Sequence, residues 1–229
     1  MKKISITAML LVFLTTAYTQ VYKGSGGAFS LGVQSLNSSG LPQISNVSPA
    51  FDEIGFNFGG YMYWQFNRFT VGIKGYGVGV RPVEEGDYRY NLSGGAILGE
   101  IGYKVLYREK NALYPFVGIG YGGVRYEVDD TRNLDLGSGS QEPILNSGVY
   151  SQGGLVYDAG IRWETFLFFE KDEPEAGLLG IEAGYQFATP NSDWNTKGGG
   201  NVIGVTDDYS FDGWFVKLTL GGFEGFFEK

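Results

Sequence analysis

The chain has 229 residues, a formal net charge of −8, 38 glycines and 16% aromatic residues, and it contains neither cysteine nor histidine. This length suffices for one all-β domain, and the composition excludes a disulfide framework, a collagen-like repeat and a disordered chain. The absence of histidine removes the commonest general base and metal ligand, and the acidic balance argues against a nucleic-acid partner.

Residues 1–19 predict a signal peptide. Lys2 and Lys3 are followed by an apolar run over residues 4–14 and by small residues over 15–19, which is the pattern of a secretory signal. The apolar run is shorter than the ~20 residues of a membrane-spanning helix. Cleavage after Ala17 and cleavage after Thr19 both fit the sequence, and we assign residues 20–229 to a single domain.

Eight segments with alternating side chains predict β-strands, over residues 27–34, 54–64, 69–80, 92–107, 114–128, 153–166, 177–188 and 211–223. The clearest is 114–128, where Val117, Ile119 and Tyr121 alternate with glycines at positions 118, 120 and 122. Such a strand has one bulky apolar face and one face without side chains. That combination suits a small barrel whose bulky residues face lipid around a crowded interior, although alternation alone also allows a soluble sandwich.

The connections between these strands alternate in length. Those over residues 35–53, 81–91, 129–151 and 189–210 are long or medium, whereas those over 65–68, 108–113 and 170–175 are shorter. Transmembrane barrels with both termini in the periplasm show this alternation, with the longer loops outside the cell. We therefore expect loops 129–151 and 189–210 to bind an extracellular partner or a glycan, the second through an exposed tip around Trp194.

Aromatic residues gather around the shorter turns. The set that we predict as an interfacial girdle is Trp64, Phe66, Phe69, Tyr107, Tyr114, Trp163, Phe166 and Phe223. Aromatic side chains with one apolar and one polar edge favour the boundary between membrane and water. The alternative is that β-proteins are rich in aromatic residues for other reasons.

Charged residues within the strands lie on the face opposite the apolar one. They are Lys74, Glu100, Lys104, Asp158, Arg162, Glu182 and Lys217. An eight-stranded barrel has a lumen just wide enough for side chains, so these charges would have to pair there, because an unpaired buried charge costs several kcal/mol. In the alternative, a soluble sheet, they would form a solvated face.

Three glycine pairs interrupt the alternation. The apolar phase slips by one residue at Gly59 and Gly60, at positions 122 and 123, and at positions 221 and 222. A bulge inserts one extra residue, which would return the apolar side chains to their original face of the sheet, and glycine is the usual residue at a bulge. We predict bulges or sharp bends at these pairs; the alternative is that glycine is simply frequent in this chain.

The run Tyr-Pro-Phe-Val-Gly-Ile-Gly-Tyr at residues 114–121 resembles a strand common in small outer-membrane β-barrels of Gram-negative bacteria, of the OmpA/OmpX transmembrane-domain type. A mature start at Gln20 is similar to secreted proteins of Bacteroidetes-like bacteria. The family usually ends on an aromatic residue that is read during assembly, whereas Glu228 and Lys229 follow Phe227 here. The resemblance implies an all-β, eight-stranded antiparallel up-and-down transmembrane β-barrel in the outer membrane, in contact with its lipid bilayer.

The expected function follows from this architecture. Some barrels of this size are lipid A acyl-modifying enzymes or omptin-like proteases, but those families use a catalytic histidine that this chain lacks. We therefore predict no enzyme activity, no cofactor and no metal. We expect a monomer with a side-chain-filled lumen and a structural or surface-interaction role through its long loops. The alternatives are a narrow pore or transporter for small solutes and a secreted lipocalin-like barrel that binds an apolar ligand.

Overall fold

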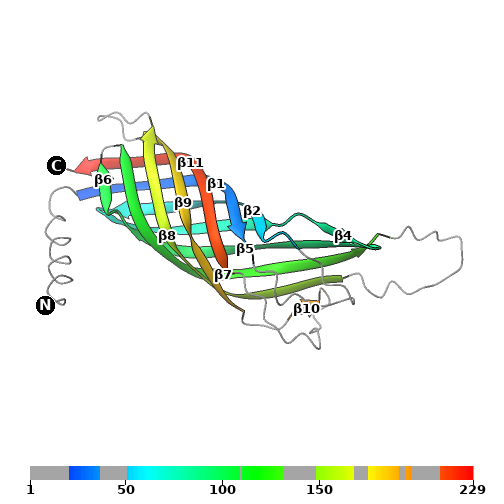
Figure 1. Cartoon of the computed structure of the whole chain (residues 1–229). Coiled ribbons are helices and arrows are strands. Elements are labelled where there is room, and N and C mark those ends of the chain that lie inside the picture. The colour runs from blue at the N-terminus through cyan, green and yellow to red at the C-terminus, as the bar shows by residue number, and fades with distance from the viewer. Residues whose placement is uncertain are drawn as a thin grey trace, which may run out of the picture.

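The computed structural model describes residues 21–36, 51–108, 110–131, 148–167, 175–190, 194–196 and 212–228, and the predicted signal peptide lies outside them. Eight long strands make up a barrel (Figure 1): β1 (Val21–Ser35), β2 (Ile54–Phe66), β3 (Phe69–Gly79), β5 (Tyr88–Tyr103), β7 (Asn111–Asp130), β8 (Gly148–Leu167), β9 (Glu175–Pro190) and β11 (Gly213–Glu228). Three short strands flank them: β4 (Val83–Glu85), β6 (Leu106–Arg108) and β10 (Asn195–Thr196). No helix in the described ranges is long and apolar enough to cross a membrane.

Each barrel strand pairs antiparallel with the next barrel strand in the chain, and the last pairs with the first. The closing pair of β1 and β11 runs from Val21 opposite Glu228 to Gln34 opposite Phe215. Closure gives each strand a hydrogen-bonded neighbour on both sides, as a strand in the bilayer core requires. The prediction of an eight-stranded antiparallel up-and-down barrel is confirmed.

The two ends of the barrel differ. At one end, here called the turn end, β1 begins, β11 ends, and only Asn67 and Arg68 connect β2 to β3; Asn67 has the left-handed φ of 55° that suits a tight hairpin turn. At the other end, here called the loop end, β5, β7 and β8 project beyond the other strands (Figure 1). β7 and β8 have 20 residues each, whereas a strand crosses a bilayer in ~9–11 residues. The loop end therefore extends beyond the membrane.

Part of the predicted connection over residues 81–91 is a hairpin. β4 pairs with the beginning of β5, with Glu85 opposite Tyr88, and Gly86 occupies the turn at a φ of 62°. The predicted connection included no strand, because its exposed charges, such as Glu84 and Arg89, conceal the alternation. The hydrogen bonds of the projecting β5 hold this segment as a strand.

The outer wall of the barrel is apolar. Large apolar side chains point outward on all eight long strands; Phe29 is 82% exposed and Leu218 is 61% exposed. Monomeric soluble proteins rarely expose apolar surface on this scale, and a closed barrel with an apolar band and a polar interior is the architecture of outer-membrane proteins. The predicted outer-membrane location is therefore confirmed, and the soluble lipocalin-like alternative is wrong.

Glycines on the inner face leave room for large side chains of the neighbouring strands. Gly160 of β8 lies opposite Phe116 of β7, and a Cβ atom on this glycine would approach the Phe116 ring to 2.7 Å. Gly184 of β9 likewise lies opposite Phe215 of β11, and a Cβ atom on this glycine would approach the Phe215 ring to 2.7 Å. Because the interior of an eight-stranded barrel is only as wide as its side chains, a large inner residue requires a minimal neighbour.

The glycine pairs that we predicted as bulges are not bulges. The strand register runs unbroken through all three, namely Gly59 with Gly60, Gly122 with Gly123, and Gly221 with Gly222. The apolar residues change face instead: Val117 and Tyr121 of β7 point toward lipid, whereas Val124 and Tyr126 point into the barrel. No residue is inserted at these pairs. The apolar side chains simply move from the outer face of the strand to its inner face.

One-residue register shifts occur at two other places. Gly79 pairs with Ser93 but Val83 pairs with Tyr90, so four steps along the β3–β4 edge correspond to three along β5. A similar shift separates β5 from β6 around Lys104. An extra residue of this kind is a β-bulge, which bends a strand and redirects its side chains.

We expect Gly160→Ala to lower the free energy of unfolding by about 1–3 kcal/mol, because the new Cβ would press on the Ala183 carbonyl oxygen and the Phe116 ring. Gly75→Ala is the matched control, since a Cβ on this glycine of β3 would meet nothing closer than 3.9 Å. Urea titration in lipid vesicles, followed by the folded band on unheated gels, measures both variants. Equal unfolding midpoints would contradict the close packing inferred for the interior.

Candidate functional site

Among the described residues, eight charged side chains are buried inside the barrel. Seven are the residues singled out from the sequence, namely Lys74, Glu100, Lys104, Asp158, Arg162, Glu182 and Lys217, and none is more than 6% exposed. The eighth is Glu164, which is 0% exposed. Four of the eight are basic and four are acidic, so the interior is electrically balanced. Because removing the partner of a buried charge is strongly destabilising, their pairing is a condition of folding.

Lys74 of β3 lies among three carboxylates at the centre of this set. Its Nζ is 3.2 Å from Glu100 Oε2 and 3.1 Å from Glu182 Oε1, and it also pairs with Asp158. The same Nζ lies 4.5 Å from the centroid of the Phe116 ring. Side chains from β5, β7, β8 and β9 thus converge on one ammonium group.

Arg162 of β8 binds two of the same carboxylates. Its Nη2 donates to Glu182 Oε2 at 2.6 Å and to Glu100 Oε2 at 2.9 Å, and its Nη1 is 2.8 Å from Glu100 Oε1. Arg162 and Glu182 stand directly opposite each other in the register of β8 and β9, and the guanidinium carbon lies 3.8 Å from the Tyr61 ring centroid. A planar guanidinium fork suits this geometry, which a lysine would not reproduce. We call Lys74, Glu100, Asp158, Arg162 and Glu182 the central ion cluster.

Glu164 anchors a second layer, nearer the turn end, that consists of tyrosine hydroxyl groups. Tyr61, Tyr63 and Tyr114 donate to its carboxylate at 3.0, 3.1 and 2.6 Å. Arg162 Nη1 donates to the Tyr114 hydroxyl at 3.2 Å, which links this layer to the central ion cluster. Glu164 was not predicted from the sequence, although it continues the inner face of β8 two residues after Arg162, so the alternation contained the signal.

Lys104 closes the turn end of the lumen. It is 0% exposed, its Nζ donates to Gln65 Oε1 at 2.7 Å, and the same atom lies 3.6 Å from Glu164 Oε2. Five aromatic rings surround the ammonium group with centroids 5.1–5.6 Å away: Tyr63, Tyr107, Tyr114, Phe166 and Phe223. We call this arrangement the lysine cage. Cation–π attraction is strongest where water is excluded, so the cage stabilises a charge that would otherwise be costly to bury.

The lysine cage corrects part of the predicted aromatic girdle. Three of its eight residues are at most 4% exposed and point into the barrel, namely Tyr114, Phe166 and Phe223. A fourth, Tyr107, is half-buried in the cage. The remaining four point outward and are 40–56% exposed: Trp64, Phe66, Phe69 and Trp163. The prediction was wrong for the inward residues because clustering near a turn does not tell which face of the strand a ring occupies.

Lys217 lies on the loop-end side of the central ion cluster. It stands opposite Glu182 in the register of β9 and β11, yet its contacts within the described part of the chain are with rings. Its Nζ is 4.3 Å from the Tyr76 ring centroid and 4.7 Å from the Phe215 ring centroid. The Tyr76 hydroxyl in turn donates to Gln186. This layer lies between the central ion cluster and the apolar side chains nearer the loop end.

A buried apolar cluster fills the barrel at the loop end, on the inner face of the projecting strands. We call it the loop-end core; it comprises Leu36, Phe51, Tyr76, Val78, Val80, Tyr90, Leu92, Ala96, Leu98, Val124, Tyr126, Val128, Val156 and Trp194. Trp194 is only 2% exposed, so its predicted place at an exposed loop tip was wrong. Its indole packs as part of the core, next to β10, which pairs with β8. Most of loops 129–151 and 189–210 lies outside the described residues.

Buried side chains therefore fill the lumen at three levels: the lysine cage, the central ion cluster and the loop-end core. The acidic and basic groups of the lumen are bound to one another or to rings and hydroxyl groups. Among the described residues, no three or more acidic side chains are grouped so that they could hold a metal ion.

Comparisons with known proteins find related shapes and no related sequence. No protein-family model matches the chain, and no curated protein matches it. One similar solved structure is Ail, the attachment invasion locus protein of Yersinia pestis, in complex with the heparin analogue sucrose octasulfate; it shares 13% identity at a TM-score of 0.44, covering 91% of this chain and 100% of that one.

Two further solved structures are similar. A major outer membrane protein from Thermus thermophilus has 12% identity and a TM-score of 0.43, covering 87% of this chain and 99% of that one. Neisserial surface protein A has 13% identity and a TM-score of 0.36, covering 90% and 97%. Similarities of this size carry no information on ligand or activity.

We expect Glu182→Gln to lower the free energy of unfolding by about 3–5 kcal/mol, because Lys74 and Arg162 would lose a shared buried counter-charge. Glu127→Gln removes an exposed partner of Arg125 and should change stability by less than ~1 kcal/mol. Denaturant titration of the two variants in the same vesicles makes the comparison. Similar losses in both variants would contradict a role of the central ion cluster in stability.

Proposed function

We propose that the protein is a non-enzymatic outer-membrane barrel with a closed lumen, whose biological role is carried by its loop end. The observation that supports this proposal is the filling of the lumen at three levels by buried, mutually bound side chains. A solute crossing the barrel would have to displace Lys104 from its five rings and separate Arg162 from two carboxylates. Such a barrel acts through its surface.

The loop end is the surface that extends farthest from the membrane. β5, β7 and β8 continue there as a sheet (Figure 1), with the loop-end core on its inner face and polar side chains such as Arg125 and Glu127 on its outer face. A rigid sheet of this kind supports long connections, as scaffolds of binding loops commonly do. In the proposed orientation the loop end faces outside the cell and the turn end faces the periplasm.

Protease treatment of intact cells tests this orientation. We expect cleavage within residues 129–151 and no cleavage within 108–113 or 170–175, because only the loop end would be accessible from outside. The fragments are identified by mass spectrometry, with lysed cells as the control for cleavability. Cleavage confined to the two shorter turns would show that the orientation is inverted.

Planar-bilayer recording tests the closed lumen. The folded protein should give no stepwise single-channel current, because the lysine cage and the central ion cluster each block the path. Lys104→Ala should also give none, since Arg162 and Glu182 remain in place behind the cage. Regular current steps from the unaltered protein would contradict a closed lumen and favour the alternative of a narrow pore for small solutes.

A further inference from the structure

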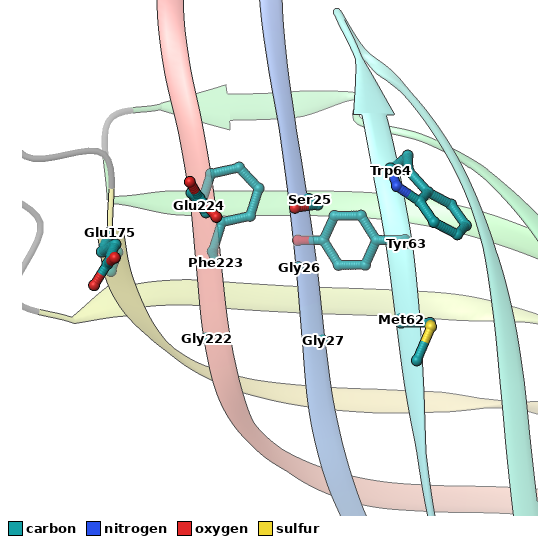
Figure 2. Close-up of a pocket in the computed structure, with 11 residues that line it drawn as sticks. Ser25, Gly26, Gly27, Met62, Tyr63, Trp64, Glu175, Gly222, Phe223 and Glu224 are labelled. Atoms are coloured by element: carbon teal, nitrogen blue, oxygen red, sulfur yellow. The ribbon is translucent and has the colours of Figure 1, made fainter.

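The outer wall near the turn end carries a groove across β9, β11, β1 and β2. Its volume is about 540 Å³, and Gly27 and Gly222, which are paired across β1 and β11, lie on its floor. Figure 2 shows Met62 and Trp64 on the β2 side and Glu175 on the β9 side. Trp64 is 50% exposed and belongs to the outward aromatic residues that favour the membrane boundary.

This groove continues toward the middle of the membrane as an apolar hollow. The hollow has a volume of about 710 Å³ and shares Gly27, Met62 and Gly222 with the groove. Apolar side chains, including Phe29 and Phe58, rise around it. The combined surface is thus amphipathic along the barrel axis, apolar at mid-membrane and polar at the turn end.

The polar end presents two exposed carboxylates on neighbouring strands. Glu175 of β9 and Glu224 of β11 stand directly opposite each other in the strand register, and both side chains are exposed. Like charges in this position destabilise a strand pair. Neither carboxylate has a basic partner among the residues that the structure describes. Because the two carboxylates lie together at the end of an apolar groove, a ligand that fits the whole surface would have a cationic group and an apolar part.

We propose that this groove binds a phospholipid with a primary-ammonium headgroup, of the phosphoethanolamine class. The ammonium lies between Glu175 and Glu224, and an acyl chain lies over Gly27 and Gly222 toward Phe29. Ser25, which is paired with Glu224 across β1 and β11, offers a hydroxyl donor to the phosphate. A primary ammonium donates three hydrogen bonds, which a quaternary headgroup cannot do, and an anionic headgroup is repelled.

A second copy of the chain fits this surface poorly. A two-fold contact through the groove would bring the same patch of both copies together, and with it four carboxylates around Glu175 and Glu224. The same charges that repel a second copy attract an ammonium group. The occupant we assign is therefore a lipid of the surrounding bilayer and not a protein partner.

The test is native mass spectrometry of the full chain released from nanodiscs that contain equal parts of phosphatidylethanolamine, phosphatidylcholine and phosphatidylglycerol. We expect phosphatidylethanolamine to be retained roughly threefold over either of the others, as two partly exposed ion pairs allow. The double variant Glu175→Gln with Glu224→Gln should retain the three lipids equally. Glu84→Gln with Glu85→Gln, which removes two exposed carboxylates of β4, should keep the preference.

The groove itself is tested by filling it. A Cβ on Gly222 would meet nothing closer than the Ala176 carbonyl oxygen at 3.8 Å, so Gly222→Leu should fold and lower the retention of bound lipid severalfold. Gly99→Leu is the matched control, since a Cβ on this outward glycine of β5 also meets nothing closer than 3.8 Å. Gel mobility of unheated samples shows that each variant is folded.

Several outcomes would overturn the proposal. Equal retention of the three lipids by the unaltered protein would do so, as would an unchanged preference in the double glutamine variant. A dimer released from the nanodiscs and disrupted by Gly222→Leu would assign the groove to a second copy instead. The conductance and protease results do not bear on these outcomes, so the lipid site and the proposed surface role can fail separately.

Discussion

The buried pairing of Arg162 and Lys74 with Glu182 and Glu100 is the interaction on which the rest of the structure depends. Taking these charges out of water costs several kcal/mol each, and the attraction between them offsets that cost only when their geometry is correct. The partners come from β3, β5, β8 and β9, so the geometry exists only in the closed barrel. A one-residue slip of any of these strands would turn its charge toward lipid. The cluster therefore selects one register among the many that a glycine-rich sheet would otherwise accept.

The high glycine content follows from the same constraint. A lumen filled by long charged and aromatic side chains leaves no volume for their neighbours, and glycine is the only residue without a Cβ. Gly118 of β7 stands between Glu100 and Asp158 in the register, and Gly32 of β1 stands opposite Lys217. The narrow interior of the barrel thus requires both that its charges form ion pairs and that glycines stand beside its large side chains. The glycines at positions 118, 120 and 122 leave one face of β7 without side chains, and the charges and rings of adjacent strands occupy the space beside that face.

Strand number, connectivity and the burial of the seven charges follow from the alternation in the sequence, because polar and apolar residues separate cleanly within the membrane. The alternation is ambiguous where both faces carry apolar residues. Val117 faces lipid and Tyr126 faces the loop-end core, and no bulge lies between them. Phe223 and Tyr114 were misassigned for the same reason, since a ring suits both the lysine cage and the membrane boundary. Of the two bulges that do occur, the one near Pro82 has a different signal in the sequence, a proline without an N–H group to donate.

The changes of face have a physical cause, which is that the solvent changes along the barrel. On the outer wall, Gly95, Gly123 and Gly153 stand side by side in the register of β5, β7 and β8. On the membrane side of this row the outward residues are apolar, as Tyr121 is, and beyond it they are polar, as Arg125 is. Within lipid the apolar side chains point outward and the charges point inward; in water the same strands reverse that order and bury an apolar core. The row of glycines lies between the two arrangements, because glycine places no side chain on the outer wall. The loop end is therefore built as a sheet with a polar outer face and an apolar core, on a base whose outer face is apolar.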